Sequence, residues 1–177
     1  ESFYDLNLDN FDSSEISLQI QQTSNDYYLK TYLPKSPLIK TQSSLHNKFK
    51  FEAINDDTEI EITTEVYEDL SVKKDSDKYE YILPNYKYSK DIVKNDYGDF
   101  VFSSNGYNMK YDTNINESII VNNLKFSSAS KFTNLGLVHN YEFLLKNFNA
   151  TASNSRNYTK KENEIKSIFN YQIKNFY

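Results

Sequence analysis

Alternation of apolar and polar residues is the feature that most limits the folds open to this chain. In residues 15–22, apolar residues occupy positions 16, 18 and 20, and polar residues fill the other positions. One side of an extended strand would hold Ile16, Leu18 and Ile20, and the other side would hold Ser17, Gln19 and Gln21. A period of two is typical of a β-strand with one apolar and one polar face.

Segments of similar character recur along the chain, separated by turns rich in Asn, Asp and Ser. We expect strands in residues 15–22, 45–53, 59–66, 78–88, 99–111, 117–126, 132–147 and 162–177. The last segment fits both a helical stripe and a strand. We favour the strand because its Asn, Tyr, Phe and Ile residues are weak helix formers. The predicted fold is all-β: an antiparallel up-and-down meander of about seven or eight strands in one continuous segment, residues 1–177.

Three positions predict local breaks in this pattern. Pro84 cannot donate a backbone hydrogen bond, so it should lie at a strand end or a bulge. The apolar phase changes between Val121 and Leu124, which suggests a bulge near residues 122–123. The Asn-Gly pair at 105–106 suggests another bulge. Residues 150–163 are polar and are interpreted as a loop.

Composition excludes several classes of protein. The mean hydropathy is -0.75, yet 16% of residues are aromatic, with 16 Tyr and 12 Phe, which is too aromatic for a disordered chain. No apolar run approaches the ~20 residues of a transmembrane helix, although barrel strands are shorter and only half apolar. The chain has no Cys, so disulfides and thiolate metal sites are excluded. The net charge of -5 and the lack of a basic cluster argue against a nucleic-acid partner.

No motif of known catalytic chemistry is present. His46 and His139 are isolated, and the chain has no Gly-rich phosphate loop and no nucleophile elbow. Glu59, Glu61 and Glu65 share one face of their predicted strand, and paired carboxylates can hydrolyse glycosidic bonds. A Glu-Ile-Glu-Ile run is more simply a solvated strand face. We therefore expect a protein that is not an enzyme and that has no cofactor and no metal.

Four stretches in the same order carry a family resemblance. They are residues 16–32 (ISLQIQQTSNDYYLKTY), 45–70 ending in VYEDL, 79–88 (YEYILPNYKY), and the strand that opens with GDFVF at 98–102. The segment NSRNYT at 154–159 falls in a predicted loop that is similar in character to the loop at this place in the same family. Together they resemble the C-terminal barrel domain of the LPS-assembly outer-membrane protein (LptD) family. Each motif alone has low specificity, and the collinear set spans nearly the whole chain.

The resemblance implies a section of a transmembrane β-barrel in the bacterial outer membrane, without the family's N-terminal jellyroll and remaining barrel strands. Its function would be transport: assembly of lipopolysaccharide in the outer leaflet. The implied partners are lipopolysaccharide, an LptE-type lipoprotein plug in the lumen, the periplasmic Lpt bridge through the jellyroll, and outer-membrane lipids. A sheet crosses a bilayer only as a closed barrel, so we expect this section not to fold stably alone.

Under this hypothesis the two faces of the strands have different surroundings. The residues expected to face lipid are Ile16, Leu18, Ile20, Ile60, Ile62 and Val66. Those expected to face the lumen are Gln19, Gln21, Glu59, Glu61 and Glu65. Tyr27, Tyr28 and Tyr32 would be rim aromatics at the end of a spanning strand.

Other interpretations of the same residues remain open. The family's structural cysteines have no counterpart in this chain. The strand pattern suits another outer-membrane barrel, such as a porin or a TonB-dependent receptor, equally well. A soluble secreted β-sandwich that binds carbohydrate through its tyrosines is a further alternative, as is a glycosidase that uses the Glu59, Glu61 and Glu65 face.

Overall fold

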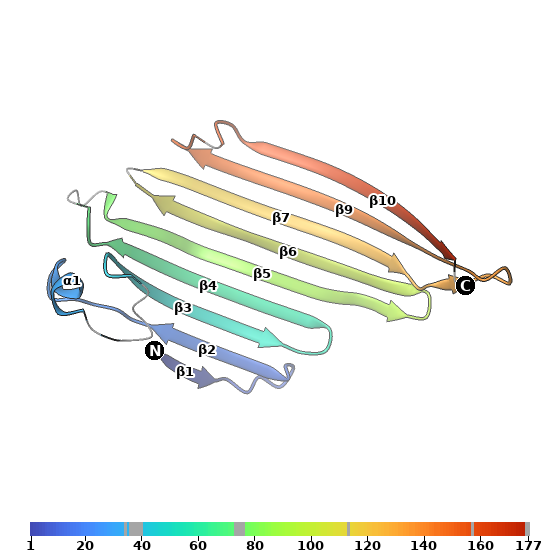
Figure 1. Ribbon diagram of the computed structural model, residues 1–177, viewed down its shortest axis with the longest axis horizontal. Coiled ribbons are helices and arrows are strands. Elements are labelled where there is room, and N and C mark those ends of the chain that lie inside the picture. Colours follow the sequence, from blue (N-terminus) through green and yellow to red (C-terminus); the bar gives the residue numbers. More distant parts are fainter. Residues whose placement is uncertain (34, 36–40, 73–76, 113, 157, 176–177) are drawn as a thin grey trace.

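The computed structural model describes residues 1–33, 35, 41–72, 77–112, 114–156 and 158–175. In these residues one antiparallel β-sheet of ten strands forms a single layer (Figure 1). Its strands lie side by side in chain order from β1 to β7, followed by β9 and β10, and the short β8 pairs with β9. The architecture is an up-and-down meander, in which nearly every strand pairs with the next strand along the chain.

The strands are β1 (Ser2–Asp5), β2 (Ser13–Gln19), β3 (Ser44–Ile54), β4 (Thr58–Asp69), β5 (Tyr79–Asn95), β6 (Gly98–Tyr111), β7 (Ile115–Ser128), β8 (Lys131–Phe132), β9 (Leu137–Ser153) and β10 (Glu162–Asn175). One short helix, α1 (Tyr28–Tyr32), lies in the connection between β2 and β3. No helix in the described part of the chain has the length and hydropathy to span a membrane.

The predicted all-β antiparallel meander is confirmed, but the expected number of seven or eight strands is too low. The two additional strands, β1 and β8, have four and two residues, which is too short to display alternation. The C-terminal segment is a strand, as favoured, although Phe176 and Tyr177 lie outside the described residues. Strand β9 continues to Ser153, so the loop expected at residues 150–163 begins only after that residue.

One of the three predicted bulges is present. The register between β4 and β5 shifts between the pairs Thr63–Asn85 and Glu65–Ile82, so an extra residue of β5 lies at Pro84. The bulge predicted at residues 122–123 is wrong, because β7 pairs without a break with both neighbours. The phase change there marks a strand that presents apolar residues on one face in its first half and on the other face in its second half.

The bulge predicted at residues 105–106 is also wrong, since β6 pairs with β7 in continuous register. Gly106 serves a different purpose. A Cβ atom at this position would lie 2.4 Å from the carbonyl oxygen of Ile119 and 3.0 Å from the ring of Tyr86. The missing side chain therefore lets the Tyr86 ring cover the backbone of β6, a known way of compensating for glycine in a sheet.

Few side chains are buried, because the sheet has no second layer. Leu29 of α1, Leu45 of β3 and Leu70 form the cluster of buried apolar residues that attaches the β2–β3 connection to the sheet. The decapeptide at residues 23–32 thus contributes a helix and a buried leucine. Its Tyr27 and Tyr32 remain largely exposed, at 71% and 69%.

Lys78 adds an electrostatic contact between two connections at the same end of the sheet. Its Nζ lies 2.9 Å from a carboxylate oxygen of Glu68 at the end of β4 and 3.0 Å from one of Asp26 in the β2–β3 connection. The hydrogen bonds to Glu68 and Asp26 raise the pKa of Lys78 above its usual value. Because the folded form binds its proton more tightly, this contribution to stability is present below the ordinary lysine pKa and is lost at more alkaline pH.

Replacing Gly106 with Ala should destabilise the native protein by about 1–3 kcal/mol, because the new Cβ would overlap the Ile119 carbonyl. Urea unfolding of the native protein, followed by circular dichroism, measures this change. The matched control is Asn108→Ala, an exposed position on the same face of β6, which should stay within about 0.5 kcal/mol. Equal effects of the two substitutions would contradict the close approach at Gly106.

Candidate functional site

Pairing across the sheet assigns each predicted residue to one of two faces, since directly paired residues of antiparallel strands lie on the same face. Ile16 pairs with Phe51, which pairs with Ile62, and Ile60 and Val66 follow the same phase of β4. Gln19 pairs with Lys48, which pairs with Glu65, and Glu59 and Glu61 share that phase. The two predicted sets therefore lie on opposite faces. We call them the apolar face and the polar face.

Two predicted residues lie beyond the end of β2. Ile20 is 66% exposed. The side-chain Oε1 of Gln21 accepts a hydrogen bond of 2.7 Å from the backbone N–H of His46. The backbone N–H of Gln21 donates one of 2.7 Å to Oδ1 of Asn47. Gln21 therefore continues the pairing of β2 with β3 through its side chain.

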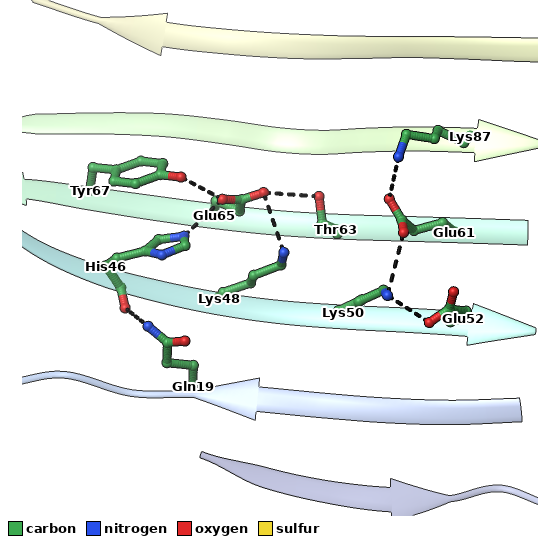
Figure 2. Close-up of polar contacts among 10 residues, drawn as sticks. All are labelled: Gln19, His46, Lys48, Lys50, Glu52, Glu61, Thr63, Glu65, Tyr67 and Lys87. Atoms are coloured by element: carbon green, nitrogen blue, oxygen red, sulfur yellow. Dashed lines mark hydrogen bonds and ion pairs between the residues drawn. The ribbon is translucent and has the colours of Figure 1, made fainter. Parts of the chain in front are cut away.

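Glu65 is the centre of a polar network on the polar face (Figure 2). Glu65 as a whole is only 8% exposed. One carboxylate oxygen lies 2.8 Å from Nε2 of His46 and accepts a 2.7 Å hydrogen bond from the Tyr67 hydroxyl. The other oxygen accepts a hydrogen bond from the Thr63 hydroxyl and lies 4.0 Å from Nζ of Lys48. Both oxygens are thus satisfied, as burial of a carboxylate requires.

The rings of His46 and Tyr67 stack beside this carboxylate, with centroids 4.2 Å apart and an interplanar angle of 3°. The backbone carbonyl of His46 also accepts a 3.0 Å hydrogen bond from the side chain of Gln19. The network thereby links strands β2, β3 and β4, as Figure 2 shows.

A second set of ion pairs continues toward the β3–β4 turn. Lys50 of β3 lies 2.6 Å from Glu52 and 3.4 Å from Glu61, and Glu61 in turn lies 3.1 Å from Lys87 of β5 (Figure 2). Charges of opposite sign alternate across three strands. Such cross-strand pairs stabilise the register of the sheet.

The charged side chains of this arrangement balance: Lys48, Lys50 and Lys87 lie against Glu52, Glu61 and Glu65. In the described residues no hydroxyl or thiol is hydrogen-bonded to the His46 ring, and the Thr63 hydroxyl donates to Glu65 instead. Glu61 and Glu65 are both engaged by donors, whereas Glu59 is exposed and has no ion pair in the described part of the chain. No group of His, Cys, Asp or Glu suited to hold a metal ion occurs among the described residues.

Sequence reasoning missed a second buried carboxylate, Glu117 of β7, which is 3% exposed. It accepts a 3.0 Å hydrogen bond from the Tyr111 hydroxyl and another from the hydroxyl of Ser155 in the β9–β10 connection. Tyr158 of that connection packs against Phe148, with ring centroids 6.4 Å apart. No sequence signal indicates this site, because Ser155 comes close to Glu117 only through the pairing of β7 with β9.

Aromatic rings form a row on the apolar face of the other half of the sheet. Phe100 of β6 packs near Phe126 of β7, which packs near Tyr141 of β9, which packs near Phe169 of β10. Successive centroids are 6.5, 5.7 and 6.4 Å apart. His139 contacts the ring of Tyr171 edge-on at 6.1 Å and belongs to no polar cluster of described residues.

Two comparisons with known proteins found no match. The sequence matches no protein-family model, and no curated protein is significantly similar to it.

Replacing Glu65 with Leu should destabilise the native protein by about 1–3 kcal/mol, because the donors of His46, Tyr67 and Thr63 would lose their acceptor. The control is Glu59→Leu, on the same face of the same strand but exposed, with an expected change within about 0.5 kcal/mol. The urea concentration at the midpoint of unfolding, measured for both variants and the wild type, gives the two changes in stability. A Glu65→Leu protein as stable as its control would show that the network contributes little.

Proposed function

We propose that this chain is a section of the wall of an outer-membrane β-barrel, with its apolar face toward lipid and its polar face toward the lumen. The observation that carries the proposal is the course of the apolar residues across the sheet. On β4 they are centred on Ile62. On β9 the residue in the same register row is Asn149, and the apolar residues are centred on Phe143 instead.

Averaged from β4 to β9, the apolar band therefore runs obliquely to the strands. Most of the displacement falls between β4 and β6, because Phe100, Phe126 and Phe143 lie in one register row. Between β4 and β9 it moves about six residues along the strand direction, or roughly 20 Å at 3.3 Å per residue. The same distance across the sheet comprises four strand steps of about 4.8 Å, or roughly 19 Å. A band at constant height therefore requires strands inclined by about 45°. Strands of membrane barrels are inclined by about 35–45°, so the band has the course expected of a lipid belt.

The lengths of the connections support the same proposal. Membrane barrels have short turns at one end and longer loops at the other. Here the two longest connections, 20–43 and 70–78, begin and end at the same end of the sheet, opposite the two-residue turn at 96–97 (Figure 1).

The open edges of the sheet favour a section of a larger barrel over a complete domain. β1 and β10 lie at opposite edges of the sheet, and all 14 residues of β10 are exposed. A bilayer tolerates no unpaired strand edge. Further strands of a longer protein would pair with these two edges. A β-sandwich would need a second sheet over the apolar face, and the described residues form one sheet only.

Within this proposal, the transported substrate is lipopolysaccharide, as the resemblance to the LptD family implies. The lumenal side would carry Gln19, Gln21, Glu59, Glu61 and Glu65, facing an LptE-type plug. The lipid side would carry Ile16, Leu18, Ile20, Ile60, Ile62 and Val66. The periplasmic bridge would be contacted by a domain outside this chain. The role of the wall section is structural: it separates lipid from lumen and catalyses no reaction.

Placing Arg at Ile62 tests the facing of the sheet. If Ile62 lies near the bilayer midplane, Ile62→Arg should cost about 2–4 kcal/mol and reduce the amount of protein assembled in the outer membrane. Glu59→Arg, on the opposite face of the same strand, should assemble nearly normally. Heat-modifiable gel mobility of the membrane fraction reports assembly.

Two results would contradict the proposal. One is normal assembly of Ile62→Arg, which would place this face away from lipid. The other is recovery of the native protein in buffer without detergent, which would favour a soluble β protein.

A further inference from the structure

The connection between β9 and β10 bends over the polar face of the sheet. We call its residues 154–156 and 158 the inward turn. The Ser155 hydroxyl donates a hydrogen bond to Glu117 of β7, and the ring of Tyr158 packs against that of Phe148. Glu117 lies on the polar face, because unbroken register connects it to Glu65 through Met109 and Ile82. Figure 1 shows this connection at the same end of the sheet as α1.

Small side chains on β9 leave room for the inward turn. Ala150 and Ala152 pair with Ile119 and Glu117 of β7. Ala150 is only 1% exposed, and Ile119, Glu117 and Ser155 are also buried. A sheet of one layer leaves both of its faces open, so burial of these residues requires side chains above the sheet. The inward turn supplies such side chains beside Glu117.

Backbone conformation and hydrogen bonds hold the inward turn in this direction. Asn154 has a φ of 59°, in the left-handed region that Asn adopts more readily than most residues. Its side chain donates a 2.9 Å hydrogen bond to the backbone carbonyl of Asn114 in the β6–β7 connection. The Ser155 hydroxyl, which donates to Glu117, accepts a 3.5 Å hydrogen bond from the backbone N–H of Tyr158. The turn is therefore a fixed part of the polar side of the sheet.

The height of the inward turn places it at one mouth of the proposed barrel. Ala152, the register partner of Glu117, lies nine residues along β9 from Phe143, the centre of the apolar band on that strand. Nine residues span roughly 30 Å of strand, or roughly 21 Å of height for strands inclined by about 45°. The hydrocarbon core of a bilayer extends about 15 Å from its midplane. The turn would therefore lie on the lumen side at the level of the headgroups.

The charged side chains of this connection are all positive. Residues 154–161 include Arg156, Lys160 and Lys161 and no Asp or Glu. All three basic residues are exposed. Basic side chains around a narrow part of a pore attract anions and repel cations. The connection thus combines a fixed inward position with a positive charge.

We propose that the inward turn forms a basic constriction inside the mouth of the barrel, which narrows the water-filled path along the lumen and favours anions over cations. This inference rests on the proposed function, because it requires that the polar face line the lumen. It assigns the chain a further function, the filtering of small solutes by size and charge. The solutes favoured are small inorganic and organic anions.

Charge selectivity is tested with the native protein in planar bilayers that separate two concentrations of KCl. The wild type should prefer chloride. Arg156→Glu should shift the reversal potential toward that of potassium, because a positive charge at the constriction becomes negative. The matched control is Lys30→Glu, the same change of charge at the same end of the sheet. Lys30 belongs to α1, whose Leu29 packs on the apolar face against Leu45, so this variant should leave the reversal potential unchanged.

The width of the path is tested with the double variant Ser155→Ala/Tyr158→Ala, which removes the contacts of the turn with Glu117 and Phe148. Its single-channel conductance should rise above that of the wild type, because the released turn no longer narrows the path. The control is Tyr32→Ala in α1, an exposed ring at the same end, with unchanged conductance. If the double variant does not fold, Arg156→Cys replaces it, and a bulky thiol reagent should then lower the conductance. This chain contributes no other cysteine.

The outcomes separate this inference from the proposed function. An unchanged reversal potential in Arg156→Glu, or a membrane-inserted wild type without conductance, would overturn the constriction and leave the barrel wall in place. Equal shifts in Arg156→Glu and Lys30→Glu would show that both connections reach the lumen, and would overturn the facing of the sheet. Wild-type protein that does not float with liposomes in a density gradient would overturn both proposals.

Discussion

Backbone pairing between neighbouring antiparallel strands is the interaction on which the rest of this structure depends. The sheet has one layer, and its buried apolar cluster consists of three leucines beside the α1 connection. A soluble sheet normally gains most of its stability from apolar residues enclosed against a second layer. Here the strand ladder and the side-chain pairs across it hold the fold, while one apolar face remains uncovered. Under the proposed function, the environment that this face meets outside the chain is lipid.

Register connects this ladder to the two polar features of the molecule. On the polar face, the pairing of Lys48 with Glu65 and of Lys50 with Thr63 brings charges of opposite sign within reach across β3 and β4. On the apolar face, the pairing of Ser104 with Asn122, and of Asn122 with Asn147, aligns three side chains that hydrogen-bond to one another. A slip of one residue in any pair of strands would exchange the two faces and break both features. The polar networks therefore help to specify the register as well as being products of it.

The β conformation of these segments, and the placement of their apolar and polar side chains on opposite faces, were predictable from single segments, because period-two alternation is local. The opposite placement of Ile62 and Glu61 follows directly from their positions in a strand. Short strands without alternation were not predictable, and β1 and β8 were missed for that reason. The interpretation of residues 122–123 failed because a change of apolar phase has two causes: a bulge, or a strand whose two halves have different surroundings. Only the unbroken pairing of β7 with β6 and β9 distinguishes them.

The sequence by itself determined that this protein is an antiparallel β meander with one apolar and one polar side on its early strands, because side chains alternate at every residue of a strand. It also determined the residue types at the candidate polar face, including Glu61 and Glu65. Tertiary structure decided which residues meet: His46 with Glu65, Ser155 with Glu117, and Asn122 with Asn147. Contacts of this kind depend on the register between strands that are distant in sequence. Register is set by the whole ladder and by its turns, and no single segment contains that information.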